Sequence, residues 1–214
     1  MVERLRQGRR PRELQVGGRG DRDDLVDVSE AAALDLSLVP GNPRLSGLTM
    51  MRITFHDIYA TWGEHDELTQ LGALELGICM LDHNLVRHAI GYLSTFGIAA
   101  EQRLGGFNVE SSVTHATLIE FRWRGAQAAY KLHFFGGDDD RERLLCVSID
   151  GHIDVLIAST NALGVLHPMT LEIRASLKLC FEEQLDWTLD DIPREFIEKL
   201  DWLPRPPGHK VFWR

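Results

Sequence analysis

The chain has 214 residues, of which 44% are apolar and 26% charged, as in ordinary globular proteins. This composition excludes a wholly disordered chain, a collagen, a disulfide miniprotein and a long coiled coil. A chain of this length buries about 70% of its unfolded surface, so its core needs neither a metal nor a disulfide. The 32 acidic and 23 basic residues give a net charge of −9, which disfavours nucleic acid and anionic membranes as partners.

The sparse cysteines predict a reducing compartment. Cys79, Cys146 and Cys180 show no CxxC spacing, so they form neither a disulfide framework nor a zinc knuckle.

The Arg-rich N-terminus lacks the apolar stretch of a signal peptide, and the longest uncharged stretch, 155–171, is shorter than the ~20 residues of a membrane span. We therefore expect a soluble, cytoplasmic protein.

The first 48 residues differ from the rest in composition. Residues 1–20 hold six Arg and two Glu, whereas 21–48 hold six acids and two Arg. So few apolar residues predict a flexible or poorly packed arm over 1–48, followed by one domain over 49–214. An alternative is that the Arg-rich arm binds nucleic acid. Another is that translation of the native protein starts at Met50 or Met51, so that the arm does not belong to it.

The first third of that domain is predicted to be one strand followed by two helices. Residues 51–55 alternate apolar and polar, which predicts the strand. From Leu68 to Phe96, apolar residues recur every three or four positions, which predicts helices over roughly 66–80 and 83–96. Asp82 is the expected N-cap of the second helix and Gly97 its C-terminal stop.

Period-two patterns dominate the second half. They predict strands over 114–123, 127–135, 142–149, 152–158 and 169–181, with Asp150-Gly151 as a two-residue hairpin turn. In 169–181 all seven odd-numbered residues are apolar. A helix over about 189–202 and a Pro-rich, basic and aromatic tail over 203–214 complete the chain.

These elements together predict an α+β fold. We expect an antiparallel sheet of five to seven strands, two helices inserted after the first strand and a C-terminal helix. The element order resembles the helix-grip arrangement, in which a curved sheet wraps a helix. The chain carries no sequence motif of that family, so the resemblance implies no ligand.

Asp150, His152 and Asp154 are the candidate catalytic residues. On a strand, His152 and Asp154 point to the same face and can share a metal ion. Together with Gly136-Gly137 the pattern resembles that of nucleotidyltransferases, with His152 in place of the first carboxylate. The alternative is that Asp150-Gly151 is only a turn, in which case we expect no metal.

Three further clusters are weaker candidates. His56-Asp57, His65-Asp66, Asp82-His83 and His88 are similar to the His-Asp pairs of HD-type phosphohydrolases, but the same residues also suit helix caps and a solvated face. The run 121–124, Phe-Arg-Trp-Arg, suits either a nucleic-acid platform or a buried Trp with exposed Arg. The tail offers a partner-binding set: Pro204, Arg205, Pro207, Phe212 and Trp213.

Without a recognisable catalytic constellation, we expect a binding or interaction protein with no cofactor. Its acidic body favours a basic protein partner or a small neutral ligand over nucleic acid. The alternative is a metal-dependent hydrolase or nucleotidyltransferase-like enzyme that uses Asp150, His152 and Asp154.

Overall fold

The computed structural model divides the chain into two units, Met1–Leu34 and Asp35–Arg214. It describes residues 43–134, 138–185 and Glu198, all of which belong to the second unit. The predicted C-terminal helix, apart from Glu198, and the tail residues Pro204, Arg205, Pro207, Phe212 and Trp213 lie outside the described residues.

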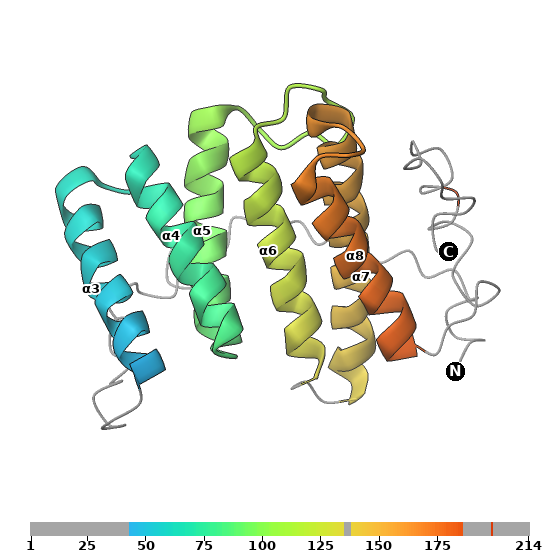
Figure 1. Ribbon diagram of the computed structural model, residues 1–214, viewed down its shortest axis with the longest axis horizontal. Helices are drawn as coiled ribbons and strands as arrows, with labels where there is room; N and C mark the ends of the chain where they lie inside the picture. Colours follow the sequence, from blue (N-terminus) through green and yellow to red (C-terminus); the bar gives the residue numbers. More distant parts are fainter. Residues whose placement is uncertain (1–42, 135–137, 186–197, 199–214) are drawn as a thin grey trace. The chain divides into compact units, whose positions relative to one another are not determined.

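Every regular element in the described residues is an α-helix (Figure 1). The helices are α3 (Pro43–Trp62), α4 (Glu67–Asp82), α5 (Val86–Leu104), α6 (Ala116–His133), α7 (Asp138–Leu163) and α8 (Pro168–Leu185). They run alternately up and down, and each packs against its neighbours in sequence. The predicted α+β fold, with its antiparallel sheet and helix-grip-like order, is therefore wrong.

The two helices predicted from three- and four-residue spacing are confirmed as α4 and α5. Asp66 caps α4, because its carboxylate accepts hydrogen bonds from the backbone N–H groups of Leu68 at 2.9 Å and Thr69 at 3.4 Å. Asp82 is the last residue of α4 rather than the N-cap of α5. Gly97 does not stop α5, which continues to Leu104.

Each predicted strand falls inside a helix. Residues 51–55 belong to α3, which begins at Pro43 and crosses the predicted arm boundary at 48. Most of 114–123 and 127–135 lies in α6, 142–149 and 152–158 lie in α7, and 169–181 lies in α8. Asp150-Gly151 is not a turn but a position inside α7.

Gly151 serves close helix packing instead of a turn. A Cβ atom built on Gly151 would lie 3.1 Å from Cβ of Ala126 on α6, tighter than an ordinary van der Waals contact. The glycine thus lets α6 and α7 approach each other. The same principle applies to Gly77 on α4, where a Cβ would lie 2.8 Å from Cδ2 of Leu93 on α5.

The main core cluster lies among α6, α7 and α8. The buried positions of its central helix, α7, follow the helical spacing up to residue 156: Leu145, Ser148, Ile149, His152, Ile153 and Leu156. Two of these residues, Ser148 and His152, are polar, whereas the exposed Val147 is apolar. From 155 to 160 every residue is buried. The apolar residues of the sequence therefore do not mark the buried face.

Candidate functional site

The three candidate catalytic residues do not share a face. Positions two apart on a helix point about 200° apart, so the metal-sharing geometry predicted for a strand is absent from α7. Asp150 and Asp154 are half-buried, whereas His152 is 0% exposed. In the part of the chain that the structure describes, no group of three or more His, Cys, Asp or Glu side chains is placed to hold a metal ion.

His152 is instead the centre of a buried polar network. Its Nδ1 lies 2.8 Å from the backbone oxygen of Ser148, and its Nε2 lies 3.0 Å from the hydroxyl of Ser176 on α8. The Ser148 hydroxyl in turn donates to the backbone oxygen of Ala126 on α6 at 2.9 Å. The network therefore joins α6, α7 and α8 through hydrogen-bonded polar groups.

Burial keeps the His152 imidazole neutral. It lowers the pKa of His152 to about 4, against the smaller opposing effect of the hydrogen bond to Ser148. With Nδ1 donating to the Ser148 carbonyl, Nε2 can accept the Ser176 hydroxyl hydrogen, as the base of a Ser–His pair does. However, a base works best with a pKa near the working pH, and this imidazole has no exposed surface. We assign the network a structural role.

The His-Asp pairs of 56–88 are dispersed. His56 and Asp57 lie on α3, His65 and Asp66 precede α4, and His88 lies in the first turn of α5. Each pair contributes locally; for example, Asp66 caps α4 and His65 lies 3.4 Å from Glu64. Their arrangement gives no support to an HD-type metal site.

His83 follows the end of α4 and contacts Cys79. Its Nδ1 lies 2.8 Å from the backbone oxygen of Cys79 and 3.8 Å from its sulfur. Burial, and secondarily Asp82, raise the pKa of the Cys79 thiol, which opposes a thiolate nucleophile. None of the three cysteines forms a disulfide bond; Cys180 is buried and the other two are half-buried.

The run 121–124 lies in α6 and contributes to the core. Phe121 and Trp123 are buried. Arg122 donates to the Glu101 carboxylate through Nε at 2.8 Å, and Arg124 stacks 4.1 Å from the Trp123 ring. The aromatic rings are buried, and both Arg side chains already contact other residues of the protein. This run is therefore not arranged to stack on nucleic-acid bases.

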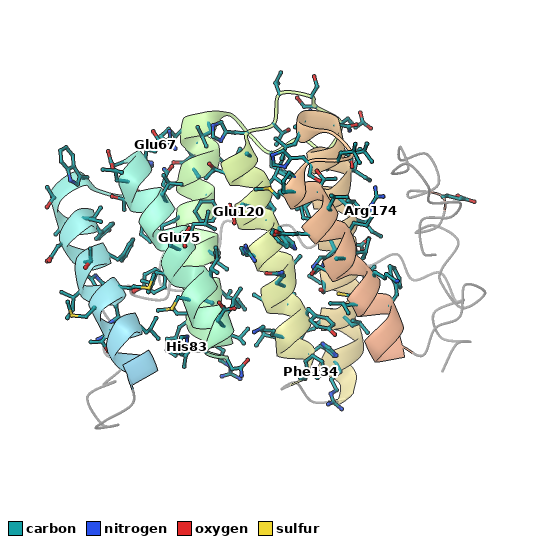
Figure 2. All side chains as sticks on the ribbon, viewed as in Figure 1. Glu67, Glu75, His83, Glu120, Phe134 and Arg174 are labelled. Atoms are coloured by element: carbon teal, nitrogen blue, oxygen red, sulfur yellow. The ribbon has the colours of Figure 1, made fainter. Side chains whose placement is uncertain are left out.

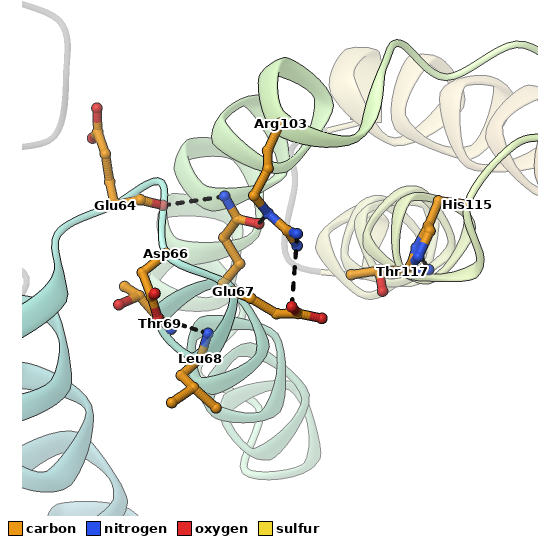
Figure 3. Close-up of polar contacts among 9 residues, drawn as sticks. Glu64, Asp66, Glu67, Leu68, Thr69, Arg103, His115 and Thr117 are labelled. Atoms are coloured by element: carbon orange, nitrogen blue, oxygen red, sulfur yellow. Dashed lines mark hydrogen bonds and ion pairs between the residues drawn. The ribbon is translucent and has the colours of Figure 1, made fainter.

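Polar contacts fix the N-terminal end of α4 against α5 (Figure 3). Nε of Arg103 donates to the side-chain oxygen of the fully buried Gln70 at 2.8 Å, and the Gln70 amide donates to the backbone oxygen of Glu64 at 3.3 Å. The same guanidinium lies 3.8 Å from the Glu67 carboxylate. These contacts hold the α3–α4 connection in place.

Exposed apolar side chains concentrate on α3 and α4. Of the thirteen large hydrophobic side chains exposed in the described residues, six lie on these two helices: Met50, Met51, Ile53, Trp62, Leu68 and Leu71. Trp62 is 62% exposed and Leu68 60%. Ile53 and Trp62 are nine positions apart on α3 and therefore face opposite ways, so the six residues do not form one patch. An exposed Trp is nevertheless typical of an interaction site.

Helical spacing places several of these side chains along one line of contact between α3 and α4. Phe55 of α3 faces Gly72 of α4, since a Cβ on Gly72 would lie 3.4 Å from the Phe55 ring. Positions spaced by three, four or seven share a helix face. By this rule Arg52 and the buried Leu48 also lie on the Phe55 face, and the buried Thr69 and Leu76 lie on the Gly72 face. We call the exposed residues of the two faces the α3–α4 seam: Met51 and Trp62 on α3, and Leu68 and Glu75 on α4.

Sequence reasoning missed the seam, because it assigned 51–55 to a strand and Leu68 and Leu71 to a core-facing stripe. One signal was available: residues 53–86 contain no Lys or Arg but six acids, namely Asp57, Glu64, Asp66, Glu67, Glu75 and Asp82. Such a charge bias indicates exposed faces on these helices, although the segment also supplies buried residues such as Phe55, Leu76 and Met80.

No helix among the described residues is both long and apolar enough to cross a membrane. Comparison with known proteins identifies no relative: no protein-family model, no curated protein and no solved structure matches this chain.

Proposed function

We propose that this chain is a protein-interaction module that binds an apolar segment of a partner at the α3–α4 seam. The observation that carries the proposal is the exposure of Trp62 and Leu68 beside the line where α3 and α4 meet. Large apolar side chains gain most from burial, about 25 cal/mol per Å² of apolar surface removed from water. Trp is also the residue type most enriched at the centres of interfaces.

Two further observations favour binding over catalysis. The described candidate residues lie on several helices, and both serines in contact with a histidine, Ser148 and Ser176, contact the same fully buried imidazole of His152. The alternative enzyme that uses Asp150, His152 and Asp154 has lost its structural basis, a shared strand face. We also expect a cytoplasmic location, because none of the three cysteines forms a disulfide bond, as is usual in a reducing compartment.

The test uses the full chain and a fluorescent helical peptide with an apolar stripe and uncharged Gln and Ser flanks. Fluorescence anisotropy should show saturable binding that weakens at least tenfold in Trp62→Ser/Leu68→Ser. Ile98→Ser is the matched control, because Ile98 is an exposed apolar residue on α5. Circular dichroism checks that each variant is folded. An absence of binding, or binding that the seam variant leaves unchanged, overturns the proposal.

A further inference from the structure

We infer that the contact between α3 and α5 binds a small oxyanion, a phosphate or carboxylate group, through Tyr92, His56 and Arg52. Tyr92 of α5 is 3% exposed, and its hydroxyl makes no hydrogen bond to any described residue. The same is true of the buried Nε2 atom of His56 on α3. Buried polar atoms are almost always hydrogen-bonded in native proteins, so two unpaired atoms at one helix contact indicate a ligand that accepts hydrogen bonds from them.

Aromatic rings hold these side chains in place. The Phe55 ring of α3 lies 5.6 Å from the His56 ring and 5.3 Å from the Tyr92 ring of α5. Arg52 lies one helical turn before His56, so the two side chains are neighbours on α3. His88, which is half-buried, lies one turn before Tyr92 on α5. Polar groups from both helices therefore flank a single aromatic contact.

The nearest charge to the two unpaired atoms is positive. Burial, and secondarily Arg52, lower the pKa of His56, against the smaller opposing effect of Asp57. Burial raises the pKa of Tyr92, and here Arg52 opposes the shift. One guanidinium thus acts on both side chains, which favours a negatively charged ligand over a metal cation.

The acids of the neighbouring helices do not fill this role. Asp57, the one acid of α3, is exposed, and Glu101, the one acid of α5, pairs with Arg122 of α6. The acids within α4, two of which are labelled in Figure 2, are also exposed: Glu67, Glu75 and Asp82. No acid of α3, α4 or α5 among the described residues therefore pairs with the two buried atoms.

The chemistry of the three side chains suits an oxyanion. The Tyr92 hydroxyl and the N–H form of His56 Nε2 can each donate one hydrogen bond, and Arg52 adds a positive charge. An oxyanion has several acceptor oxygens, so one group can accept from both atoms through charge-assisted hydrogen bonds. Arg52 and His56 are half-buried, so the cluster extends to the protein surface, where a solute can reach it.

The experiment titrates the full chain with inorganic phosphate in one arm and with acetate in the other. Calorimetry measures the heat of binding, and a thermal melt measures the midpoint of unfolding. Chloride at equal ionic strength is the reference, because salt by itself changes stability. We expect saturable binding in at least one arm, with a rise in the midpoint that follows the occupancy of the site. The arm with the tighter binding identifies the ligand group.

Tyr92→Phe is the decisive variant, because it removes the hydroxyl and keeps the ring. It should weaken anion binding about tenfold, as the loss of one hydrogen bond to a charged group provides. In chloride its midpoint should equal or exceed that of the natural chain, since the variant removes a buried group without a partner. Tyr59→Phe is the matched control: the Tyr59 ring also stacks on Phe55, at 6.2 Å, and the variant should bind the anion as the natural chain does.

Three results would overturn the site. The first is an absence of saturable binding in both arms. The second is binding that Tyr92→Phe leaves unchanged or that Tyr59→Phe weakens equally. The third is a lower midpoint of Tyr92→Phe in chloride, which would mean that the hydroxyl already has a partner within the protein.

Discussion

Nζ of Lys131 on α6 donates a hydrogen bond of 2.5 Å to the backbone oxygen of Leu81, in the last turn of α4. The carbonyl groups at the end of a helix lack partners within the helix, and they carry the negative end of its dipole. The Leu81 carbonyl already accepts a hydrogen bond from the backbone N–H of Asn84 at 3.0 Å, and Lys131 adds a charged donor from a helix that is distant in sequence. This contact links α4 to α6 across α5.

Replacing Lys131 by Met should therefore destabilise the fold by about 1.5 to 3 kcal/mol, the typical contribution of a hydrogen bond to a charged group. Met keeps the apolar stem but removes the donor. Arg87→Met, at an exposed position of α5, should change the free energy of unfolding by less than about 0.5 kcal/mol. Urea denaturation measures both; equal effects would show that Lys131 contributes no specific cap.

Acid should destabilise the protein through His152. The unfolded imidazole titrates near 6.5, whereas burial lowers the folded pKa to about 4. The unfolded state therefore binds more protons between these values. The contribution of neutral His152 is complete above about pH 6.5, and about 3 kcal/mol of it is lost as the pH falls to about 4.

Urea denaturation between pH 4 and 7 measures this dependence. His152→Gln should flatten the slope, whereas His65→Gln, at an exposed position, should leave it unchanged. If the slope survives in His152→Gln, other groups cause the acid sensitivity.

Gly77→Ala should destabilise by about 1 to 3 kcal/mol, the usual cost of overpacking. The new Cβ would lie 2.8 Å from Cδ2 and 2.9 Å from Cγ of the buried Leu93. Gly91→Ala on α5 is the opposite case, because a Cβ there meets nothing within 4 Å. It should stabilise by up to about 1 kcal/mol through helix propensity. Thermal melts of the two variants should move in opposite directions; a common direction would refute the packing at Gly77.

Three substitutions on α8 test its helical register. Leu177 is 0% exposed, Leu179 is 48% exposed and Cys180 is buried. Gln at 177 or 180 should cost several kcal/mol because it buries an unpaired amide, whereas Leu179→Gln should stay within about 0.5 kcal/mol. A strand would give large effects at both 177 and 179 and a small one at 180, so chemical denaturation distinguishes the two structures.

The boundary of the folded part is testable by truncation. A chain that begins at Pro43 should keep the thermal midpoint of the full chain, because residues 1–20 hold few apolar side chains and the charges of residues 1–48 cancel. A chain that begins at Met50 lacks the start of α3 and Leu48, which is 1% exposed. Its midpoint should fall by several degrees, since burying a Leu side chain contributes about 1.5 to 3 kcal/mol. A lower midpoint for the chain that begins at Pro43 would mean that residues 1–42 stabilise the fold.

The sequence by itself determined α4 and α5. Their apolar residues recur with the helical period, because each helix buries a restricted part of its surface, and Asp66 marks the start of α4 by the chemistry of its carboxylate. The charge bias of residues 53–86 is equally a property of the sequence. These features are local, so no knowledge of distant contacts is needed to read them.

Only the tertiary structure decided that 114–181 is helical. In α8, the buried residues Thr170, Ile173, Leu177, Cys180 and Phe181 follow the helical period, but Leu171 and Leu179 are apolar and exposed, which produces the false period of two. In α7, the buried face includes the polar Ser148 and His152 while the apolar Val147 is exposed, which hides the helical period. Gly151 is needed for contact with Ala126 rather than for a turn. His152 likewise acquires its hydrogen bond to Ser176 only because α8 packs against α7. Which residues are buried depends on which helices pack together, and this packing depends on contacts between segments that are distant in sequence.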